Sequence, residues 1–170
     1  MSGIAQRNAS RVLVVAIGNP DRADDGVGAL VATRLAGRLP SDVVLISRSG
    51  DILSLIEDWA CFDAVICIDA AAPMGMAGRI HRIDVVSGEL PHDVSFASSH
   101  AFGLAEAIAL AGVLRWLPGT IIVFAVEGVC FAGGSAMTPE VTAAAAEVAD
   151  RVIAEVGRLR RHEEKVVSDA

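Results

Sequence analysis

Short apolar runs alternate along this chain with segments in which apolar residues recur at helical spacing. Four continuous apolar runs, rich in β-branched residues, predict buried strands at 11–17, 43–47, 62–69 and 120–126. Helical spacing predicts helices at 27–39, just after Asp51, at 100–114 and at 139–162. Because strands alternate with helices, we expect an α/β fold: a three-layer α/β/α sandwich around a mostly parallel sheet of about five strands.

Two further segments refine this picture. Residues 79–86 alternate apolar and polar positions, which is typical of a half-exposed strand near a sheet edge. Thr138-Pro139-Glu140 opens the last helix with a cap, a proline in the first turn and an acid near the positive end of the helix dipole. Asp51, and Ser98 or Ser99, are expected to cap the two shorter helices.

The chain of 170 residues is predicted to form one domain over 1–170, with loose polar termini at 1–10 and 163–170. Its longest apolar stretch, 101–134, contains three charged residues and Pro118-Gly119, so we expect a buried helix and a buried strand rather than a membrane span. No basic stretch followed by an apolar segment opens the chain, so no secretory signal is expected.

Charge and cysteine content narrow the functional classes. The formal net charge of −7 argues against a nucleic-acid partner, because no basic stripe is available to meet phosphates. Cys61, Cys67 and Cys130 are odd in number and have no paired spacing, which favours free thiols in a reducing cytoplasm. We therefore expect a cytoplasmic protein that binds neither nucleic acid nor membrane, with a monomer as the default.

Three residues suited to metal binding fall at one edge of the predicted sheet. Asp25 follows the first strand, Asp69 ends the third, and His100 begins the helix before the last strand. Two carboxylates and one imidazole suit a divalent metal of borderline hardness and leave coordination positions open. Taken singly, each residue has an ordinary structural explanation: Asp24, Asp25 and Asp69 as turn formers or caps, and His100 as a first-turn residue. The residues alone therefore give a candidate metal site.

Other catalytic patterns are absent from the sequence. It has neither the His-Glu-x-x-His pattern of zinc proteases nor the Gly-x-Ser-x-Gly of serine hydrolases. Gly26-Val27-Gly28 has the wrong spacing from Gly18 for a nucleotide-binding loop. The remaining histidines have no identifiable partner and are predicted to be structural: His81, His92 and His162.

Four segments, in order, resemble the hydrogenase maturation endopeptidases. GNPDRADDGVG at 18–28 is similar to the family's opening motif, in which a strand leads into Gly-Asn, a short loop, two acids and glycine. Ile68-Asp69-Ala70 matches the second acid after a hydrophobic strand. SHAFGLAE at 99–106 matches the family's His-x-x-Gly-Leu helix start, and MTPEV at 137–141 matches the entry to its last helix. The resemblance runs from about residue 12 to residue 156.

This resemblance implies a phosphorylase/hydrolase-like fold and an endopeptidase activity. Family members remove the C-terminal extension of a nickel-iron hydrogenase large-subunit precursor once nickel has been inserted. The family's metal-binding and catalytic residues correspond to Asp25, Asp69 and His100, with Asp25 at a position where some members have glutamate. The nickel is expected to arrive with the substrate, and another divalent metal can occupy the site in isolation.

Two other interpretations remain open. Peptidyl-tRNA hydrolases also have a Gly-Asn-Pro turn after the first strand, but their Thr-Arg-His-Asn stretch is replaced here by Thr33-Arg34-Leu35-Ala36. Alternatively, the chain is a non-catalytic metal-binding or partner-binding module on the same scaffold. Within the peptidase interpretation, the motifs identify the scaffold but not the substrate protein. The substrate could therefore be a related nickel protein.

Overall fold

A single five-stranded sheet organises the fold. The structure is a computed structural model that describes residues 11–49, 51–87 and 104–168. The strand order is β2-β1-β3-β5-β4; β1, β2, β3 and β5 run parallel, whereas β4 is antiparallel to β5. The strands are β1 (Val12–Ile17), β2 (Val44–Arg48), β3 (Ala64–Ala71), β4 (Ile80–Asp84) and β5 (Thr120–Glu127).

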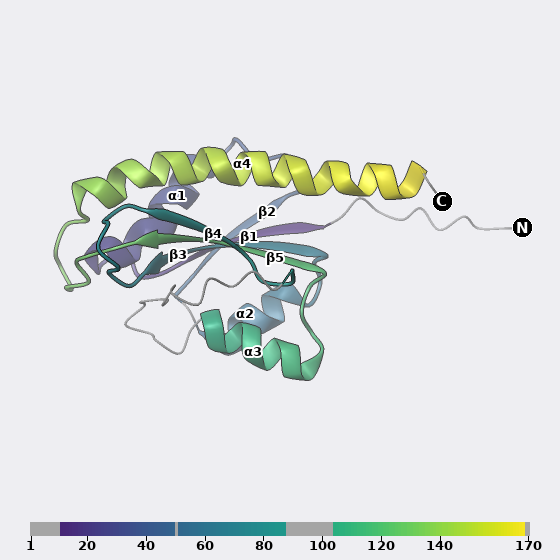
Figure 1. Ribbon diagram of the computed structural model, residues 1–170, viewed down its shortest axis with the longest axis horizontal. Helices are drawn as coiled ribbons and strands as arrows, with labels where there is room; N and C mark the ends of the chain where they lie inside the picture. The colour runs from purple at the N-terminus through teal and green to yellow at the C-terminus, as the bar shows by residue number, and fades with distance from the viewer. Residues whose placement is uncertain (1–10, 50, 88–103, 169–170) are drawn as a thin grey trace, which may run out of the picture.

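Helices cover both faces of the sheet, as Figure 1 shows. One face is covered by α1 (Val27–Leu35) and α4 (Pro139–Ser168), which contact each other, and the opposite face by α2 (Ile52–Trp59) and α3 (Leu104–Leu114). In the described part of the chain, no helix is long and apolar enough to cross a membrane. The predicted three-layer sandwich with a mostly parallel sheet is therefore confirmed.

The three central strands supply most of the core. Every residue of β1 and β3 is buried, because these strands have a neighbour on both sides and helices on both faces. Successive side chains point to opposite faces, so Ile66 packs towards α1 and α4 while Val65 packs towards α2 and α3. Each such buried aliphatic side chain contributes about 1.5–3 kcal/mol. The prediction that β4 lies at an edge is confirmed by its terminal place in the sheet.

Several predicted boundaries are wrong by a few residues. Helix α1 ends at Leu35 rather than at residue 39, because Ala36 is extended with ψ 123° and Gly37 takes a left-handed φ of 73°. Strands β3 and β5 both continue past their predicted ends, to Ala71 and Glu127.

The last helix is also longer than predicted. Helix α4 reaches Ser168, so 163–168 belong to it rather than to a loose terminus, since neither glycine nor proline follows Gly157 to stop it. Residues 1–10 and 169–170 lie outside the described residues.

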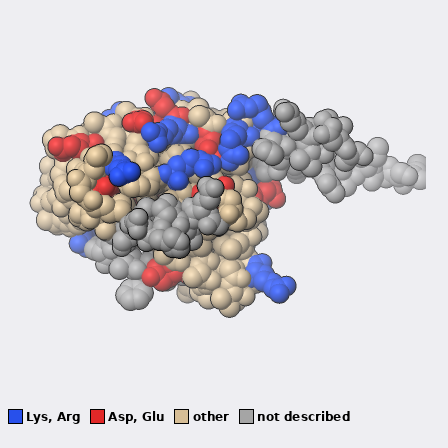
Figure 2. All heavy atoms as spheres, in the orientation of Figure 1, with Lys and Arg blue, Asp and Glu red and all other residues tan. Residues whose placement is uncertain are grey.

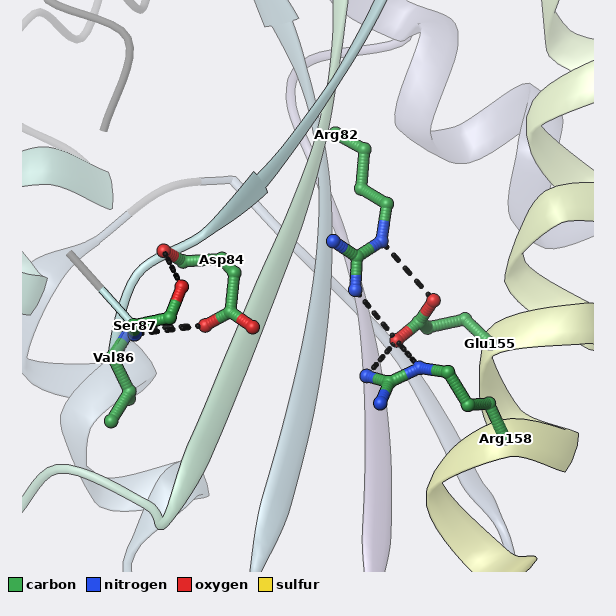
Figure 3. A network of polar contacts seen from close by, with 6 residues as sticks. All are labelled: Arg82, Asp84, Val86, Ser87, Glu155 and Arg158. Carbon is green, nitrogen blue, oxygen red and sulfur yellow. Dashed lines mark hydrogen bonds and ion pairs between the residues drawn. The ribbon is translucent and has the colours of Figure 1, made fainter. Parts of the chain in front are cut away.

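An ion pair between Arg82 of β4 and Glu155 of α4 joins the last helix to the sheet. On the face shown in Figure 2, basic side chains gather where α4 passes over β4, with acidic side chains among them. Between these two elements, the carboxylate of Glu155 accepts hydrogen bonds from Arg82 of β4, at 3.0 and 3.2 Å, and from Arg158 of α4 (Figure 3). Burial alone would raise the pKa of Glu155, but the two arginines outweigh it and hold the pKa below its usual value.

We predict that Glu155→Gln lowers the free energy of unfolding by about 1–2 kcal/mol at pH 7, because two charge-assisted contacts weaken. Since the folded pKa is depressed, this stabilisation is present above the unfolded value of 4.5 and is lost as the pH falls below it. Urea denaturation at pH 7 and pH 3.5 measures both effects.

Glu147→Gln is the matched control, because the side chains of Glu147 and its partner Arg151 are 57% and 45% exposed. It should change stability by less than about 0.5 kcal/mol. An equal loss in both variants would show that burial of Glu155 adds nothing to its ion pairs.

Candidate active site

The candidate site begins in the loop that follows β1. Gly18 has a φ of 127°, and a Cβ added there would lie 1.9 Å from the carbonyl oxygen of Asp25. Only glycine therefore allows the loop to fold back on itself at this point. The return places Asp25 in a short 3-10 helix (Ala23–Gly26), where its Oδ2 accepts a hydrogen bond of 3.0 Å from the backbone of Asn19.

The glycine pair after Asp25 has a packing role. A Cβ on Gly28 would lie 2.3 Å from the carbonyl oxygen of Ile17, at the end of β1. The first turn of α1 can thus pack directly against the strand that precedes it. This close contact explains Gly28 without a nucleotide, in agreement with the wrong spacing for a nucleotide-binding loop.

Asp24 is saturated with hydrogen bonds from the segment between β5 and α4. Its Oδ2 accepts from the backbone of Val129 and Cys130, both at 2.9 Å. Its Oδ1 accepts from the backbone and hydroxyl of Thr138, at 2.7 and 2.9 Å. Burial alone would raise the pKa of this carboxyl, but the four bonds outweigh it and hold the pKa below its usual value. Asp24 is therefore a structural anchor with no oxygen left for a ligand.

Other contacts hold the same two loops together. The guanidinium of Arg22 donates to the carbonyl oxygen of Phe131, and the backbone of Gly134 donates to the carbonyl oxygen of Asp21 at 2.8 Å. Ala23 has a left-handed φ of 48°, a conformation that costs a non-glycine residue roughly 1–2 kcal/mol. The surrounding bonds maintain this strained residue immediately before the two adjacent acids.

Asp69 lies on β3, on the sheet face that α2 and α3 cover, next to Cys67 and Ala71 of the same face. It is 1% exposed, and its Oδ1 accepts a hydrogen bond of 2.8 Å from the backbone of Ala70. Burial raises its pKa to about 7; the Ala70 hydrogen bond lowers the pKa, and the negative charge of Asp25 raises it. Asp25 and Asp69 are therefore close enough for their charges to interact, as predicted from their place at one edge of the sheet.

The two carboxylates have capacity for a ligand. Asp25 is fully buried, and its Oδ1 has no hydrogen-bond partner within the described ranges. In the same part of the chain, neither Asp25 nor Asp69 takes part in an ion pair. Two buried carboxylates with an open oxygen suit a divalent cation, which would offset their mutual repulsion.

The third predicted ligand, His100, lies outside the described residues. Within them, no group of three or more acidic, histidine or cysteine side chains is placed to hold a metal ion. The structure thus brings together Asp25 and Asp69, while the position of His100 stays a prediction. His92 and the side chain of His162 also lie outside the described residues.

Glu127 was missed by the sequence analysis. It is fully buried at the end of β5, and its Oε1 accepts hydrogen bonds from the backbone of Met74 and Met76, at 2.5 and 2.6 Å. Its Oε2 lies 4.0 Å from Nε2 of His81, a histidine that we expected to be structural. An acid at the end of a buried strand was the signal that identified Asp69, and the same signal was available for Glu127.

Comparison with known proteins identifies the fold. No protein-family model matches the sequence, and no curated protein matches it. Among solved structures, the hydrogenase maturating endopeptidase HybD from E. coli superposes with a TM-score of 0.72 at 21% identity, covering 87% of this chain and 93% of that one. The chain has the fold of the hydrogenase maturation endopeptidases.

Two archaeal structures with this fold agree. The [NiFe] hydrogenase maturation protease HycI from Thermococcus kodakarensis KOD1 has a TM-score of 0.65 at 25% identity, covering 88% of this chain and 94% of that one. The maturation protease HybD from Thermococcus kodakarensis has a TM-score of 0.65 at 22% identity, covering 84% and 99%. The fold implied by the sequence motifs is therefore confirmed along most of the chain.

We predict that Asp24→Ala lowers the free energy of unfolding by about 3–5 kcal/mol, because four hydrogen bonds to a buried carboxylate are lost, each worth about 1 kcal/mol. Chemical denaturation at pH 7 measures the loss. Since the folded pKa is depressed, the contribution should also fade as the wild-type protein is taken below the usual value of 3.8. Asp21→Ala, at an exposed position of the same loop, should have little effect.

Asp69→Asn should stabilise the metal-free protein at pH 8. Because the folded pKa of Asp69 is raised to about 7, the native state holds a proton that the unfolded chain releases near pH 3.8. Wild-type stability therefore falls as the pH rises between these values, by on the order of a few kcal/mol. Melting at pH 5 and pH 8 with a chelator should show a larger gain for the variant at pH 8. An equal gain at both pH values would contradict the raised pKa.

Proposed function

We propose that this protein is an endopeptidase that removes the C-terminal extension of a nickel-loaded precursor of a [NiFe] hydrogenase large subunit. The observation that carries the proposal is the pair of buried, interacting carboxylates, Asp25 and Asp69, at the carboxyl edge of the sheet. The fold shared with named maturation endopeptidases and the four ordered motifs support the same activity.

In this proposal the nickel belongs to the substrate. The precursor's own thiolates hold the ion, and Asp25 and Asp69 offer oxygen ligands to its remaining positions, with His100 as the third ligand that the sequence suggests. A metal held in this way can polarise a carbonyl group or lower the pKa of a bound water. The two buried carboxylates repel each other until a cation arrives, so the site favours a precursor that carries its metal over one that does not.

The ionisation of Asp69 fits this task. With a pKa of about 7, its carboxyl is partly protonated at neutral pH. Binding a cation favours the ionised form and releases the proton, so we expect recognition to weaken as the pH falls below about 7. Three free cysteines are compatible with action in a reducing cytoplasm, which is where we place the processing step.

Co-expression with a nickel-loaded large-subunit precursor tests the proposal, with cleavage read from the mobility and mass of the large subunit. Wild-type protein should remove the extension. Asp25→Ala, Asp69→Asn and His100→Ala should each reduce processing at least 100-fold, because each removes a group that contacts the metal. Circular dichroism checks that the variants remain folded.

Asp21→Asn, in the same loop as Asp25 but exposed, is the matched control and should process normally. A precursor left uncut by wild-type protein, while an active relative cuts its own precursor in parallel, would rule out the peptidase. Binding of the precursor without cleavage would instead identify a non-catalytic module.

A further inference from the structure

A second polar pair lies beside Asp69, two strands away. Asp69 on β3, Ala125 on β5 and His81 on β4 are partners in adjacent strands, so they form one row across the sheet. Side chains in one row share a face, and the face of Ala125 is the one that α2 and α3 cover. Strand spacing places the backbones of Asp69 and His81 about 10 Å apart, with Ala125 on the strand between them.

Glu127 lies on the same face, closer to the carboxyl edge. It is the partner of Ala71, two residues beyond Asp69 on β3. One of its oxygens is committed to the backbone of Met74 and Met76, whereas Oε2 is buried and has no hydrogen-bond partner within the described ranges. The buried Nε2 of His81 likewise has no partner there. Leaving such buried polar atoms without hydrogen bonds costs about 1–3 kcal/mol of stability each. A ligand group that bonds both atoms would therefore be stabilised here.

The separation of the two atoms defines what fits between them. At 4.0 Å, Oε2 and Nε2 are too far apart to bond each other. A single oxygen or nitrogen atom at about 2.8–2.9 Å from each can bridge them. Because the carboxylate only accepts, the bridging atom must carry a hydrogen.

The surrounding charges favour a neutral group. Burial and the positive charge of Arg79 lower the pKa of His81, which outweighs the opposite effect of Glu127, so the imidazole is neutral at pH 7. Because the charge of Arg79 reaches the imidazole of His81, a cation bound beside Nε2 would be repelled by the same charge, whereas a hydroxyl or amide group would not.

We propose that His81 and Glu127 form a binding subsite for a neutral hydrogen-bond donor, a carboxamide NH2 or a hydroxyl, of the polypeptide that reaches Asp69. The inference rests on the proposed peptidase function and names a further part of its substrate site. The group donates a hydrogen to Glu127 Oε2. His81 Nε2 makes the second contact, as acceptor from the other hydrogen of an NH2 group or as donor to a hydroxyl oxygen.

The role of the other Glu127 oxygen supports this placement. It fixes the backbone of the loop after β3, and the carbonyl oxygen of Glu127 accepts a further bond of 2.7 Å from Gly78. The loop thereby holds Met74 and Met76, 37% and 60% exposed, at the carboxyl edge. Methionine side chains adapt to varied apolar partners, so the same carboxylate that binds the polypeptide's polar group also presents an apolar wall to it.

Three substitutions at two positions change the subsite with little effect on its surroundings. In Glu127→Gln the amide oxygen can still accept the bonds from Met74 and Met76, while its NH2 group replaces the acceptor that faces His81. His81→Ala removes the second contact, and His81→Gln restores a polar group at that place. Controls come from the opposite face of the same region: Arg82→Ala and Glu155→Gln disturb the ion pairs of Figure 3 without approaching the subsite.

The test measures kcat and KM for processing of the nickel-loaded precursor by the full-length variants, together with precursor Kd and melting temperature. His81→Ala and Glu127→Gln should raise KM about tenfold or more and leave kcat within about twofold, as expected when a substrate-binding hydrogen bond is lost. His81→Gln should recover part of the loss. Arg82→Ala and Glu155→Gln should lower the melting temperature but leave KM unchanged.

The outcomes separate the two proposals. If the wild type processes the precursor and both subsite variants keep its KM, the pair binds only a structural water and the subsite is overturned, while the peptidase stands. If the wild type binds the precursor without cutting it, the peptidase is overturned. In that case a tenfold rise in Kd for His81→Ala supports the subsite, and an unchanged Kd overturns the subsite. If the wild type neither cuts nor binds, both are overturned.

Discussion

The carboxylate of Asp24 is the contact on which the site depends. It joins the loop after β1 to the segment between β5 and α4 through four hydrogen bonds, and so fixes two distant parts of the chain at one edge of the sheet. Burying a charge is costly unless it is fully hydrogen-bonded, and here that condition is met. Asp25 follows directly, so its position is determined by the anchor before it.

Two adjacent aspartates thus have opposite roles. Asp24 has every oxygen bonded and a lowered pKa, whereas Asp25 keeps one buried oxygen without a described partner. Asp69, facing Asp25, has its pKa raised to about 7. The difference follows from the supply of donors: backbone N–H groups converge on Asp24, while Asp25 and Asp69 receive one backbone bond each. In the proposed function, this imbalance is what favours binding of a cation.

The two oxygens of Glu127 on β5 also differ in their contacts. One oxygen accepts hydrogen bonds from the loop after β3, and the other lies 4.0 Å from His81, so one buried acid both fixes a loop and has an oxygen available for a ligand. On the opposite side of β4, Glu155 of α4 accepts hydrogen bonds from two arginines, Arg82 and Arg158, and these contacts join α4 to the sheet. Helices pack against a buried core on both faces of the sheet, but Asp69, His81 and Glu127 lie on the face of α2 and α3, whereas Glu155 and its arginines lie on the face of α1 and α4.

Much of this was predictable from the sequence. Continuous apolar runs identified the central strands, because a strand covered on both faces needs apolar side chains at every position. The alternation in 79–86 predicted an edge strand, and Asp51 was correctly predicted to cap α2. The placement of Asp25 and Asp69 at strand ends predicted that they would meet, since parallel strands end at a common edge.

Tertiary structure alone decided which acid remains available. The partners of Asp24 lie 105 to 114 residues away, so residue type and local spacing do not distinguish it from its neighbour Asp25, which only the family resemblance singled out. His81 lies near Glu127 only because β4 runs antiparallel beside β5. The residue pattern of neither strand predicts this arrangement. Periodicity reports which side chains are buried, whereas the hydrogen-bond partners of a buried charge depend on contacts between distant segments.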